Sequence, residues 1–144
     1  FQIKKKVKRN YYFFLINGDI FTRLNFSKLI SFAKKGNFEL VVAYINKTQK
    51  NSYGVMNIKN NIVSSIIEKP TNKHSINTGV YVIKNTKNLS KISKNKFLTM
   101  PKLIDLYLNK KIRVGAYKVR EFWTSIENAD NLLETEKKIN KIIK

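Results

Sequence analysis

Two continuous apolar runs, each followed by polar residues, organise the first third of the chain. Residues 11–16 are aromatic or aliphatic and end at Asn17, Gly18 and Asp19, which predicts a buried strand that ends in a turn. Residues 40–45 form a second run of the same length that is rich in β-branched residues. Strands buried on both faces are typical of parallel sheets, so the two runs predict an α/β fold.

A helix is predicted between these two strands. Apolar residues recur at helical spacing across residues 29–33, with Asn25 or Ser27 placed to cap the first turn and Gly36 placed to end the helix. A strand, a helix and a strand in this order form the unit that builds doubly wound sheets. We therefore expect a Rossmann-like, mostly parallel sheet with helices on both faces.

From residue 53 onward the predicted strands are short. Residues 53–58 and 62–67 alternate on either side of a polar turn at residues 59–61, which predicts an antiparallel hairpin that we expect to act as a small lid. Residues 76–83 predict another strand with Gly79 in its middle. An interior glycine of this kind marks a bulge or a place where a ligand or backbone comes close.

The last third of the chain predicts two helices and a strand. Residues 97–108 follow a helical pattern with Pro101 in the first turn, residues 112–119 alternate as a strand, and residues 130–143 predict a terminal helix. The apolar residues of that last helix are expected to face inward; they are Leu132, Leu133, Ile139, Ile142 and Ile143.

The composition excludes several classes of protein. A length of 144 residues with 42% hydrophobic residues fits one domain and argues against disorder. The absence of cysteine excludes a disulfide scaffold, a thiolate nucleophile and an iron–sulfur cluster. No apolar run approaches the approximately 20 residues that a membrane-spanning helix needs, and the basic start lacks a signal-peptide cleavage site. We therefore expect a cytoplasmic protein that does not associate with membranes.

The net charge of +20 suggests a nucleic-acid ligand, but the type of cation argues against it. Of the 29 basic residues, 25 are lysines spread from end to end, whereas base reading and phosphate clamping favour arginine. This excess is more typical of a solvated surface. Binding that falls steeply with salt and ignores Asp19→Ala would support a basic nucleic-acid-binding module instead.

Candidate chemistry follows the first predicted strand. Ligands of open α/β sheets bind beyond the carboxyl ends of the strands, where Gly18 would let a ligand approach the backbone. The Asp19 carboxylate could hold Mg²⁺, which usually takes one or two carboxylates together with substrate phosphates. An ordinary turn with a helix-capping aspartate explains the same residues, and the spacing alone favours capping.

Two further groups of polar residues suit a ligand that carries hydroxyls and a phosphate. Glu68 and Lys69 place an anionic acceptor beside a compact cation at the end of a predicted strand. Asn77 offers amide donors and an acceptor close to Gly79. A surface ion pair before a turn explains the first group equally well, and the second is unspecific by itself.

Five sequence blocks taken in order are more specific than any one of them. They read FLINGDI, SYGV, IEKP, INTGVY and FWTSI and lie at residues 14–20, 52–55, 67–70, 76–81 and 122–126. The series resembles the later two thirds of the nucleotidyl transferase family, the sugar-1-phosphate nucleotidylyltransferases. The resemblance implies one partial nucleotidyl transferase domain over residues 1–144. In the family's reaction a sugar 1-phosphate oxygen attacks the α-phosphate of a nucleoside triphosphate and releases pyrophosphate.

The resemblance also implies roles for individual residues. Asp19 would be the metal-binding carboxylate for Mg²⁺, and Lys69 would lie near the sugar phosphate. Gly54 would lie against the sugar, whose hydroxyls Glu68 and Asn77 would bind. The full set of substrate-binding residues that the resemblance implies is Gly18, Tyr53, Gly54, Glu68, Lys69, Asn77 and Gly79.

Two departures from the family pattern bear on catalysis. The family begins with a strand and a Gly-rich loop that carries an arginine, with a lysine further on, and these groups cradle the triphosphate. This opening segment is not found here: residues 1–10, which precede the first predicted strand, contain no glycine, so they cannot supply the loop whose backbone donors would hold the phosphates, and the catalytic arginine and lysine of that segment are absent with it. The position of the family's second metal-binding aspartate is occupied by Ser125, which is neutral. Residue 1 is Phe rather than Met, which indicates a processed chain or a piece of a longer protein.

The sequence therefore favours two functional hypotheses over that of a nucleic-acid-binding module. In the first, the chain is part of a transferase domain and is inactive alone. In the second, it is a non-catalytic remnant or a regulatory partner that binds a nucleotide sugar or an active relative. In both, loss of the first strand–helix–strand portion should expose Phe13, Phe14 and Val41 and cause marginal stability or self-association. A sharp, reversible two-state melt of a monomer would contradict that expectation.

Overall fold

The computed structural model describes residues 7–90, 97–126, 132, 133, 135–137, 139 and 140. The chain divides into two compact units. Residues 1–44 and 77–144 form the first, called the sheet unit, and residues 45–76 form the second, called the hairpin unit. None of the helices in the described ranges is long and apolar enough to cross a membrane.

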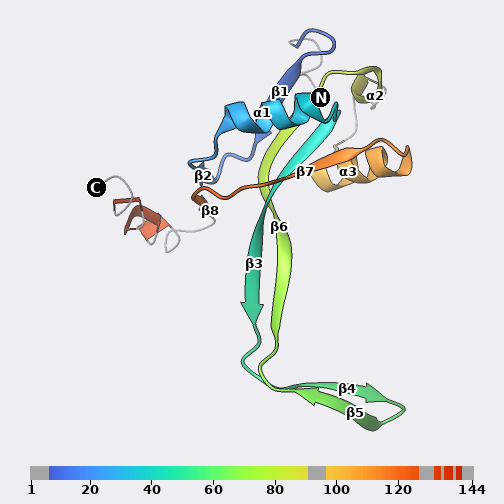
Figure 1. The fold of residues 1–144 in the computed structure, drawn as a ribbon, viewed down its shortest axis with the longest axis vertical. Coiled ribbons are helices and arrows are strands. Elements are labelled where there is room, and N and C mark those ends of the chain that lie inside the picture. Colours follow the sequence, from blue (N-terminus) through green and yellow to red (C-terminus); the bar gives the residue numbers. More distant parts are fainter. Residues whose placement is uncertain (1–6, 91–96, 127–131, 134, 138, 141–144) are drawn as a thin grey trace. The chain divides into compact units, whose positions relative to one another are not determined.

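The sheet unit is built on four strands in the order β1-β6-β3-β7 (Figure 1). β1 pairs with β6 in antiparallel register, from Tyr12 opposite Lys84 to Ile16 opposite Val80. β3 pairs with β7 in parallel register, with Leu40 opposite Val114. The presence of a parallel pair in a sheet with helices confirms the predicted α/β class. The strands span Tyr12–Ile16 (β1), Leu40–Lys50 (β3), Thr71–Lys84 (β6) and Val114–Lys118 (β7).

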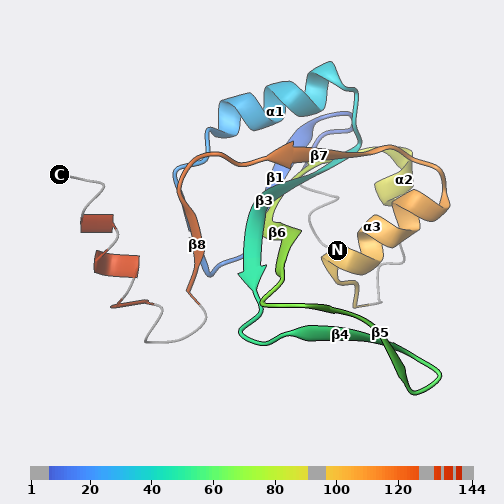
Figure 2. The ribbon, with the colours of Figure 1, turned by 60° about the horizontal axis from the view of Figure 1, so that its bottom comes forward.

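Helices cover both faces of this sheet, as Figure 2 shows for α1 (Phe26–Lys35) and α3 (Met100–Asn109). On one face the Phe14 ring meets Phe26 of α1 edge to face, with ring centroids 5.2 Å apart. On the other face Leu103 of α3 packs in the core cluster. Alternate strand residues point to opposite faces, so each strand feeds both layers. The second layer's buried members are Leu40, Tyr81, Ile83, Leu89, Leu103 and Tyr107.

The ends of both helices follow local signals in the sequence. Asn25, rather than Ser27, caps α1, because its Oδ1 accepts the backbone N–H of Lys28 at 2.9 Å. Gly36 ends α1 as predicted, with its N–H donated to the carbonyl of Phe32. α3 begins at Met100, three residues later than predicted, and has Pro101 in its first turn. A four-residue helix, α2, spans Lys87–Ser90.

The burial of the first two strands differs from the prediction. β1 is only partly buried, because it is an edge strand whose neighbour in the sheet is β6. Phe13 and Phe14 are accordingly half-buried. The expected exposure of Val41 is wrong: it is fully buried, because β3 lies between β6 and β7 and its neighbours cover it. Self-association through the β1 edge stays a prediction.

The terminal helix predicted over residues 130–143 is described only in part, at residues 132, 133, 135–137, 139 and 140. The inward orientation predicted for its first two leucines is wrong, since Leu132 and Leu133 are exposed. Thr135 is buried instead, and Ile139, one turn later, is half-buried. The covered stripe therefore follows residues 135 and 139. The predicted positions Ile142 and Ile143 lie outside the described residues.

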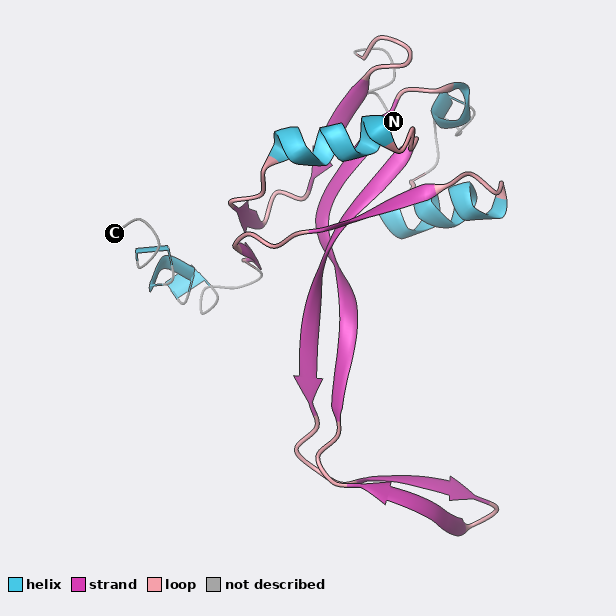
Figure 3. Cartoon of the chain, in the orientation of Figure 1, coloured by secondary structure: helices cyan, strands magenta, loops and turns pink. Residues whose placement is uncertain are grey.

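The hairpin unit contains the predicted antiparallel hairpin, β4 (Val55–Lys59) and β5 (Ile62–Ile67), shown in Figure 3. Asn60 and Asn61 form its turn with φ values of 50° and 63°, the positive values that a two-residue hairpin turn requires. The register shifts between Asn57 and Ile58. The strands are exposed along their whole length. The role of a lid stays a prediction.

Tyr107 gives the core a measurable pH dependence. Its hydroxyl is buried without a hydrogen-bond partner among the described residues. Burial first, and the negative charge of Glu39 second, raise the pKa of Tyr107 from 10.0 to about 12, against a polar interaction with the Thr86 side chain that lowers it. Because the folded pKa lies above the unfolded one, the stabilising contribution is complete below pH 10.0 and is lost as the pH rises to about 12.

We expect the free energy of unfolding of the wild type to fall relative to Tyr107→Phe by up to about 2 kcal/mol across that window. Denaturant unfolding at stepped pH measures it. Tyr53→Phe, at an exposed tyrosine, is the control and should follow the wild type. Parallel curves for wild type and Tyr107→Phe would contradict the prediction. Below pH 10, Tyr107→Phe should be close to neutral, because the buried hydroxyl that it removes has no well-formed hydrogen bond to any described residue.

Candidate functional site

A two-stranded ladder joins the first and the last of the five sequence blocks. β2 (Ile20–Thr22) pairs antiparallel with β8 (Trp123–Ser125), with Ile20 opposite Ser125. The carbonyl of Asp19, one residue before this ladder, accepts the N–H of Ile126 at 2.8 Å. The tertiary structure thus makes Asp19 and Ser125 near neighbours at the end of the turn that follows β1. These are the two positions that the resemblance assigns to metal ligands.

Trp123 and Thr78 tie this ladder to the central sheet. The indole Nε1 of Trp123 donates to the carbonyl of Thr78 at 2.9 Å. The buried Thr78 hydroxyl donates in turn to the carbonyl of Ala43 on β3 at 2.8 Å. β8 is therefore held against β6 at Thr78, the residue between Asn77 and Gly79. No local sequence signal predicts this chain of bonds, because Trp123 and Thr78 are far apart along the chain.

Gly79 is required by its conformation and by a close neighbour. Its φ is +73°, in the left-handed region that favours glycine. A Cβ at this position would lie 2.8 Å from Nδ2 of Asn17. The Gly79 carbonyl accepts the backbone N–H of Asn17 at 2.9 Å. The interior glycine therefore marks a close approach between two segments, as its position in a strand predicted.

The Asn77 amide is held at both ends. Its Oδ1 accepts the N–H of Gly79 at 3.0 Å, and its Nδ2 donates to the hydroxyl of Tyr81 at 2.6 Å. Of these contacts, the one with Tyr81 was not predicted, since residues four apart in a strand are not normally neighbours. Asn77 is exposed, so the rest of its amide faces solvent.

The residues around Asp19 and Ser125 offer few ligands for a divalent cation. Asp19 is exposed and offers one carboxylate, and Ser125 offers a hydroxyl. In the part of the chain that is described, no group of three or more His, Cys, Asp or Glu side chains could hold a metal ion. One carboxylate suffices for Mg²⁺ only where substrate phosphates and water supply its other ligands.

The hairpin unit brings together the other four predicted residues. A Cβ at Gly54 would lie 2.9 Å from Oε2 of Glu68, so glycine leaves room for that carboxylate. Lys69 has a φ of +45°, a strained conformation for lysine of the kind that is concentrated at ligand sites. Tyr53 is 78% exposed, and its N–H is donated to the side chain of Asn51 at 3.2 Å. The seven predicted substrate-binding residues thus form one group in each unit.

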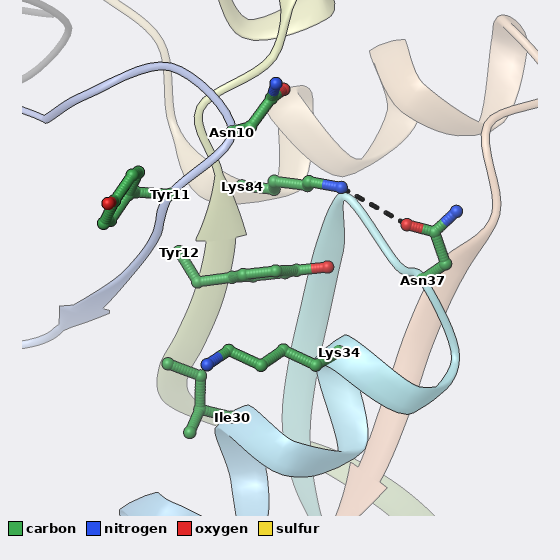
Figure 4. Close-up of a pocket in the computed structure, with 7 residues that line it drawn as sticks. All are labelled: Asn10, Tyr11, Tyr12, Ile30, Lys34, Asn37 and Lys84. Carbon is green, nitrogen blue, oxygen red and sulfur yellow. Dashed lines mark hydrogen bonds between the residues drawn. The ribbon is translucent and has the colours of Figure 1, made fainter.

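A groove of about 660 Å³ lies elsewhere, at the beginning of β1 rather than at its end. Figure 4 shows Lys84 and Lys34 extended on either side of the Tyr12 ring. Lys84 donates to Oδ1 of Asn37 at 3.3 Å, and its Nζ lies 5.5 Å from the centre of the Tyr12 ring. None of the residues predicted for the site lines this groove. The lining residues are Asn10, Tyr11, Tyr12, Ile30, Lys34, Asn37 and Lys84.

The sequence profile of one family, described as Nucleotidyl transferase, matches residues 1–142. The chain belongs to the nucleotidyl transferase family. This confirms the resemblance drawn from the five blocks. The site described above therefore lies in a domain of this family, at the turn after β1 and in the adjoining part of β6.

Three similar proteins extend the comparison. The chain is 27% identical over 134 residues to glucose-1-phosphate adenylyltransferase of Mycoplasma mobile, a match that covers 85% of this chain and 35% of the relative. HddC from Yersinia pseudotuberculosis has a similar structure, with a TM-score of 0.62 at 21% identity over 96% of this chain and 59% of HddC. HddC has also been solved in complex with GMP-PN.

A Bacillus anthracis protein assigned as a glucose-1-phosphate thymidylyltransferase, solved with sucrose, has a TM-score of 0.64 at 20% identity. That match covers 92% of this chain and 56% of the relative. At these identities the structural matches support the fold. The chain spans about a third of the length of the adenylyltransferase and less than three fifths of the two solved relatives.

Proposed function

We propose that this chain is the sugar- and metal-binding part of a sugar-1-phosphate nucleotidylyltransferase domain. The observation that supports the proposal is the β2–β8 register, in which Ser125 lies opposite Ile20 and the next residue, Ile126, donates its N–H to the carbonyl of Asp19. Two residues before Asp19, the N–H of Asn17 is donated to the carbonyl of Gly79. A neighbourhood of one carboxylate, one hydroxyl and one held amide suits a ligand with phosphate and hydroxyl groups. Two of the relatives are named for glucose 1-phosphate, which agrees with that class of ligand.

In the proposed reaction an oxygen of the sugar phosphate attacks the α-phosphorus of a nucleoside triphosphate. A new P–O bond forms to the sugar phosphate, and the bond to the bridging oxygen breaks, so pyrophosphate leaves and a nucleotide sugar remains. Bound Mg²⁺ would neutralise phosphate charge in this step. Asp19 would hold it, with Ser125 contributing at most a neutral oxygen. Reactions of this kind depend mainly on positioning and on charge neutralisation.

The remaining roles follow from the two groups of residues. In the sheet unit, Gly18 would lie open to the ligand, since no atom lies within 4 Å of a Cβ built on it. Asn77 would bind sugar hydroxyls beside Gly79. In the hairpin unit, Glu68 would bind hydroxyls, Lys69 would pair with the sugar phosphate, and Tyr53 and Gly54 would line the sugar. We expect the protein to work in the cytoplasm.

The 144 residues alone are not expected to catalyse this reaction. Residues 1–10 hold no glycine, so these ten residues do not form a Gly-rich loop that could cradle the triphosphate. A second candidate function, that of a non-catalytic binder or regulatory partner, is favoured by one observation, the neutral Ser125 at the metal position. Pyrophosphate release, tested after an upstream phosphate-binding segment and Ser125→Asp are both supplied, separates the two. An enzyme fragment should gain Mg²⁺-dependent release, and a pure partner should not.

Binding of glucose 1-phosphate by the full 144-residue chain tests the common part of both functions. We expect saturable binding that Mg²⁺ strengthens, and Asp19→Ala should abolish the Mg²⁺ dependence and weaken binding about tenfold. Titration calorimetry with and without Mg²⁺ measures both effects. Asp105→Ala, which removes an exposed carboxylate on α3, is the matched control and should behave as wild type. Binding that falls steeply with salt and is indifferent to Asp19→Ala would instead support a polyanion-binding module.

A further inference from the structure

The kink at Gly79 brings together two side chains that a regular strand would hold apart. Residues four apart in a strand are separated by about 13 Å along its axis. Asn77 and Tyr81 are four apart on β6, yet the Asn77 Nδ2 lies 2.6 Å from the Tyr81 hydroxyl. The left-handed φ of +73° at Gly79 bends the strand between them. Gly79 also fixes the amide directly, by donating its N–H to the Asn77 Oδ1 at 3.0 Å.

The hydrogen-bond pattern determines which way the Asn77 amide points. The backbone N–H of Gly79 can only donate, so the atom that faces it must be the amide oxygen. The amide nitrogen then faces Tyr81 and donates to its hydroxyl. An asparagine amide has two N–H groups and two lone pairs on oxygen. One N–H and one lone pair are used here, and one of each remains for a ligand.

The Tyr81 hydroxyl is a fixed anchor rather than a mobile one. Tyr81 is 3% exposed, and its ring belongs to the core cluster with Leu103 and Tyr107 of α3. The core therefore sets the position of the hydroxyl, and the hydroxyl sets the position of the amide nitrogen. A surface asparagine that is not held in this way would lose rotamer entropy each time it bound a ligand.

We propose that Tyr81 is a positioning residue that orients the Asn77 amide toward a hydroxyl-bearing ligand. The inference rests on the proposed function for the role of Asn77 and goes beyond it by assigning a role to a core residue. A side chain that presents one N–H and one lone pair side by side is matched by hydroxyls, which both accept and donate. A carboxylate or a sulfate, which only accepts, uses half of it. The held amide therefore selects for the sugar end of a sugar phosphate.

The test uses the full chain, glucose 1-phosphate as the probe, and the variants Tyr81→Phe and Asn77→Ala with their double variant. Tyr81→Phe should weaken binding about 3- to 10-fold, which is the range for one hydrogen bond. In the Asn77→Ala background the same change should have no further effect, because Tyr81 acts through Asn77. Independent additive losses would overturn the proposal. Inorganic sulfate, which only accepts, should bind equally to wild type and Tyr81→Phe, and an equal loss for sulfate would also overturn it.

A second readout needs no ligand. In NMR spectra of the wild type, the side-chain amide hydrogens of Asn77 should exchange slowly with solvent. Tyr81→Phe should make this hydrogen exchange fast. Unchanged signals would overturn the orienting role. Tyr107→Phe is the matched control, because it removes another buried hydroxyl from the same core cluster that has no partner among the described residues, and it should change neither readout.

The failure of the proposed function is distinguishable from the failure of this inference. If wild type does not bind glucose 1-phosphate, or if Asn77→Ala binds as well as wild type, the role of Asn77 as a ligand residue is wrong. In that case the proposed selection for a hydroxyl-bearing ligand is wrong as well. The NMR signals of the Asn77 side-chain amide still show whether Tyr81 orients Asn77. If Asn77→Ala weakens binding and Tyr81→Phe does not, only the positioning role is wrong.

Discussion

Ser125→Asp is expected to tighten Mg²⁺ binding by about tenfold or more. Ser125 lies opposite Ile20 in the β2–β8 ladder, one residue from the carbonyl contact between Asp19 and Ile126. Aspartate at this position would add a second carboxylate beside Asp19, and the affinity of a hard cation rises with the number of charged oxygens around it. Titration calorimetry with Mg²⁺ at fixed ionic strength measures the change.

Thr124→Asp is the matched control for this substitution. It adds the same charge one residue earlier on β8, where Thr124 lies opposite Phe21 and is therefore further along the ladder from Asp19. A general electrostatic effect on a chain of charge +20 would tighten Mg²⁺ binding equally in both variants. We expect Thr124→Asp to bind Mg²⁺ like wild type. Equal gains in the two variants would show that residue 125 is not part of a metal site.

The combination of Ser125→Asp with Asp19→Ala sharpens the test. If the two carboxylates share one ion, removal of Asp19 should cost the engineered variant more than it costs the wild type, because the two substitutions are coupled. Additive effects would mean that the new carboxylate binds Mg²⁺ elsewhere. A coupled result would also indicate that the serine, rather than the surrounding fold, limits metal binding in this chain.

Gly79→Ala is expected to destabilise the chain by about 2 kcal/mol and to weaken glucose 1-phosphate binding. Alanine must adopt a φ of +73°, which is strained for any residue with a Cβ. That Cβ would also lie 2.8 Å from the Asn17 Nδ2, so the Asn17 side chain would have to move. Because the Gly79 N–H also holds the Asn77 amide, a shift at residue 79 should disturb the proposed ligand site. Denaturant unfolding and calorimetric titration measure the two effects.

Gly18→Ala is the control for Gly79→Ala. Gly18 lies in the same site, but no atom comes within 4 Å of a Cβ built on it, and among the described glycines only Gly79 has a positive φ. We expect Gly18→Ala to change the free energy of unfolding by less than about 0.5 kcal/mol. Comparable losses in the two variants would contradict the argument from backbone conformation.

The double variant Asn17→Ala/Gly79→Ala separates the two causes of instability. It removes the amide that the new Cβ would meet and leaves the strained φ unchanged. Its loss should therefore be smaller than the sum of the two single losses. A loss of stability equal to the sum of the two single losses would mean that the strained backbone at residue 79 causes the whole effect of Gly79→Ala.

Local signals in the sequence were sufficient for most of the elements. Apolar runs, helical spacing, Gly36 and the asparagine-rich turn at Asn60 predicted strands, helices and the hairpin, because each of these depends on neighbours within a few residues. The limits of α3 and the choice between Asn25 and Ser27 as the cap needed the structure. Ends of elements depend on single hydrogen bonds, such as the one from Lys28 to Asn25.

Strand order determines how deeply β1 and β3 are buried, which the apolar pattern of each strand did not predict. Val41 and the residues of β1 have similar apolar patterns, yet Val41 is fully buried and β1 is half-buried. The difference arises because β3 has neighbours on both sides and β1 is an edge strand of the four-stranded sheet. Period and composition describe one strand at a time, so they do not specify which strand is flanked.

The sequence by itself determined the candidate residues and, through the order of five blocks, the family. Only the tertiary structure decided how these residues meet. The ladder that makes Asp19 and Ser125 neighbours, the indole bond from Trp123 to Thr78 and the bond from Asn77 to Tyr81 all join residues that no local pattern links. Each depends on backbone directions set by distant strand pairing or by the bend at Gly79. The amino-acid order names the chemical groups of the site, and the packing of the sheet fixes which of their atoms a ligand can reach.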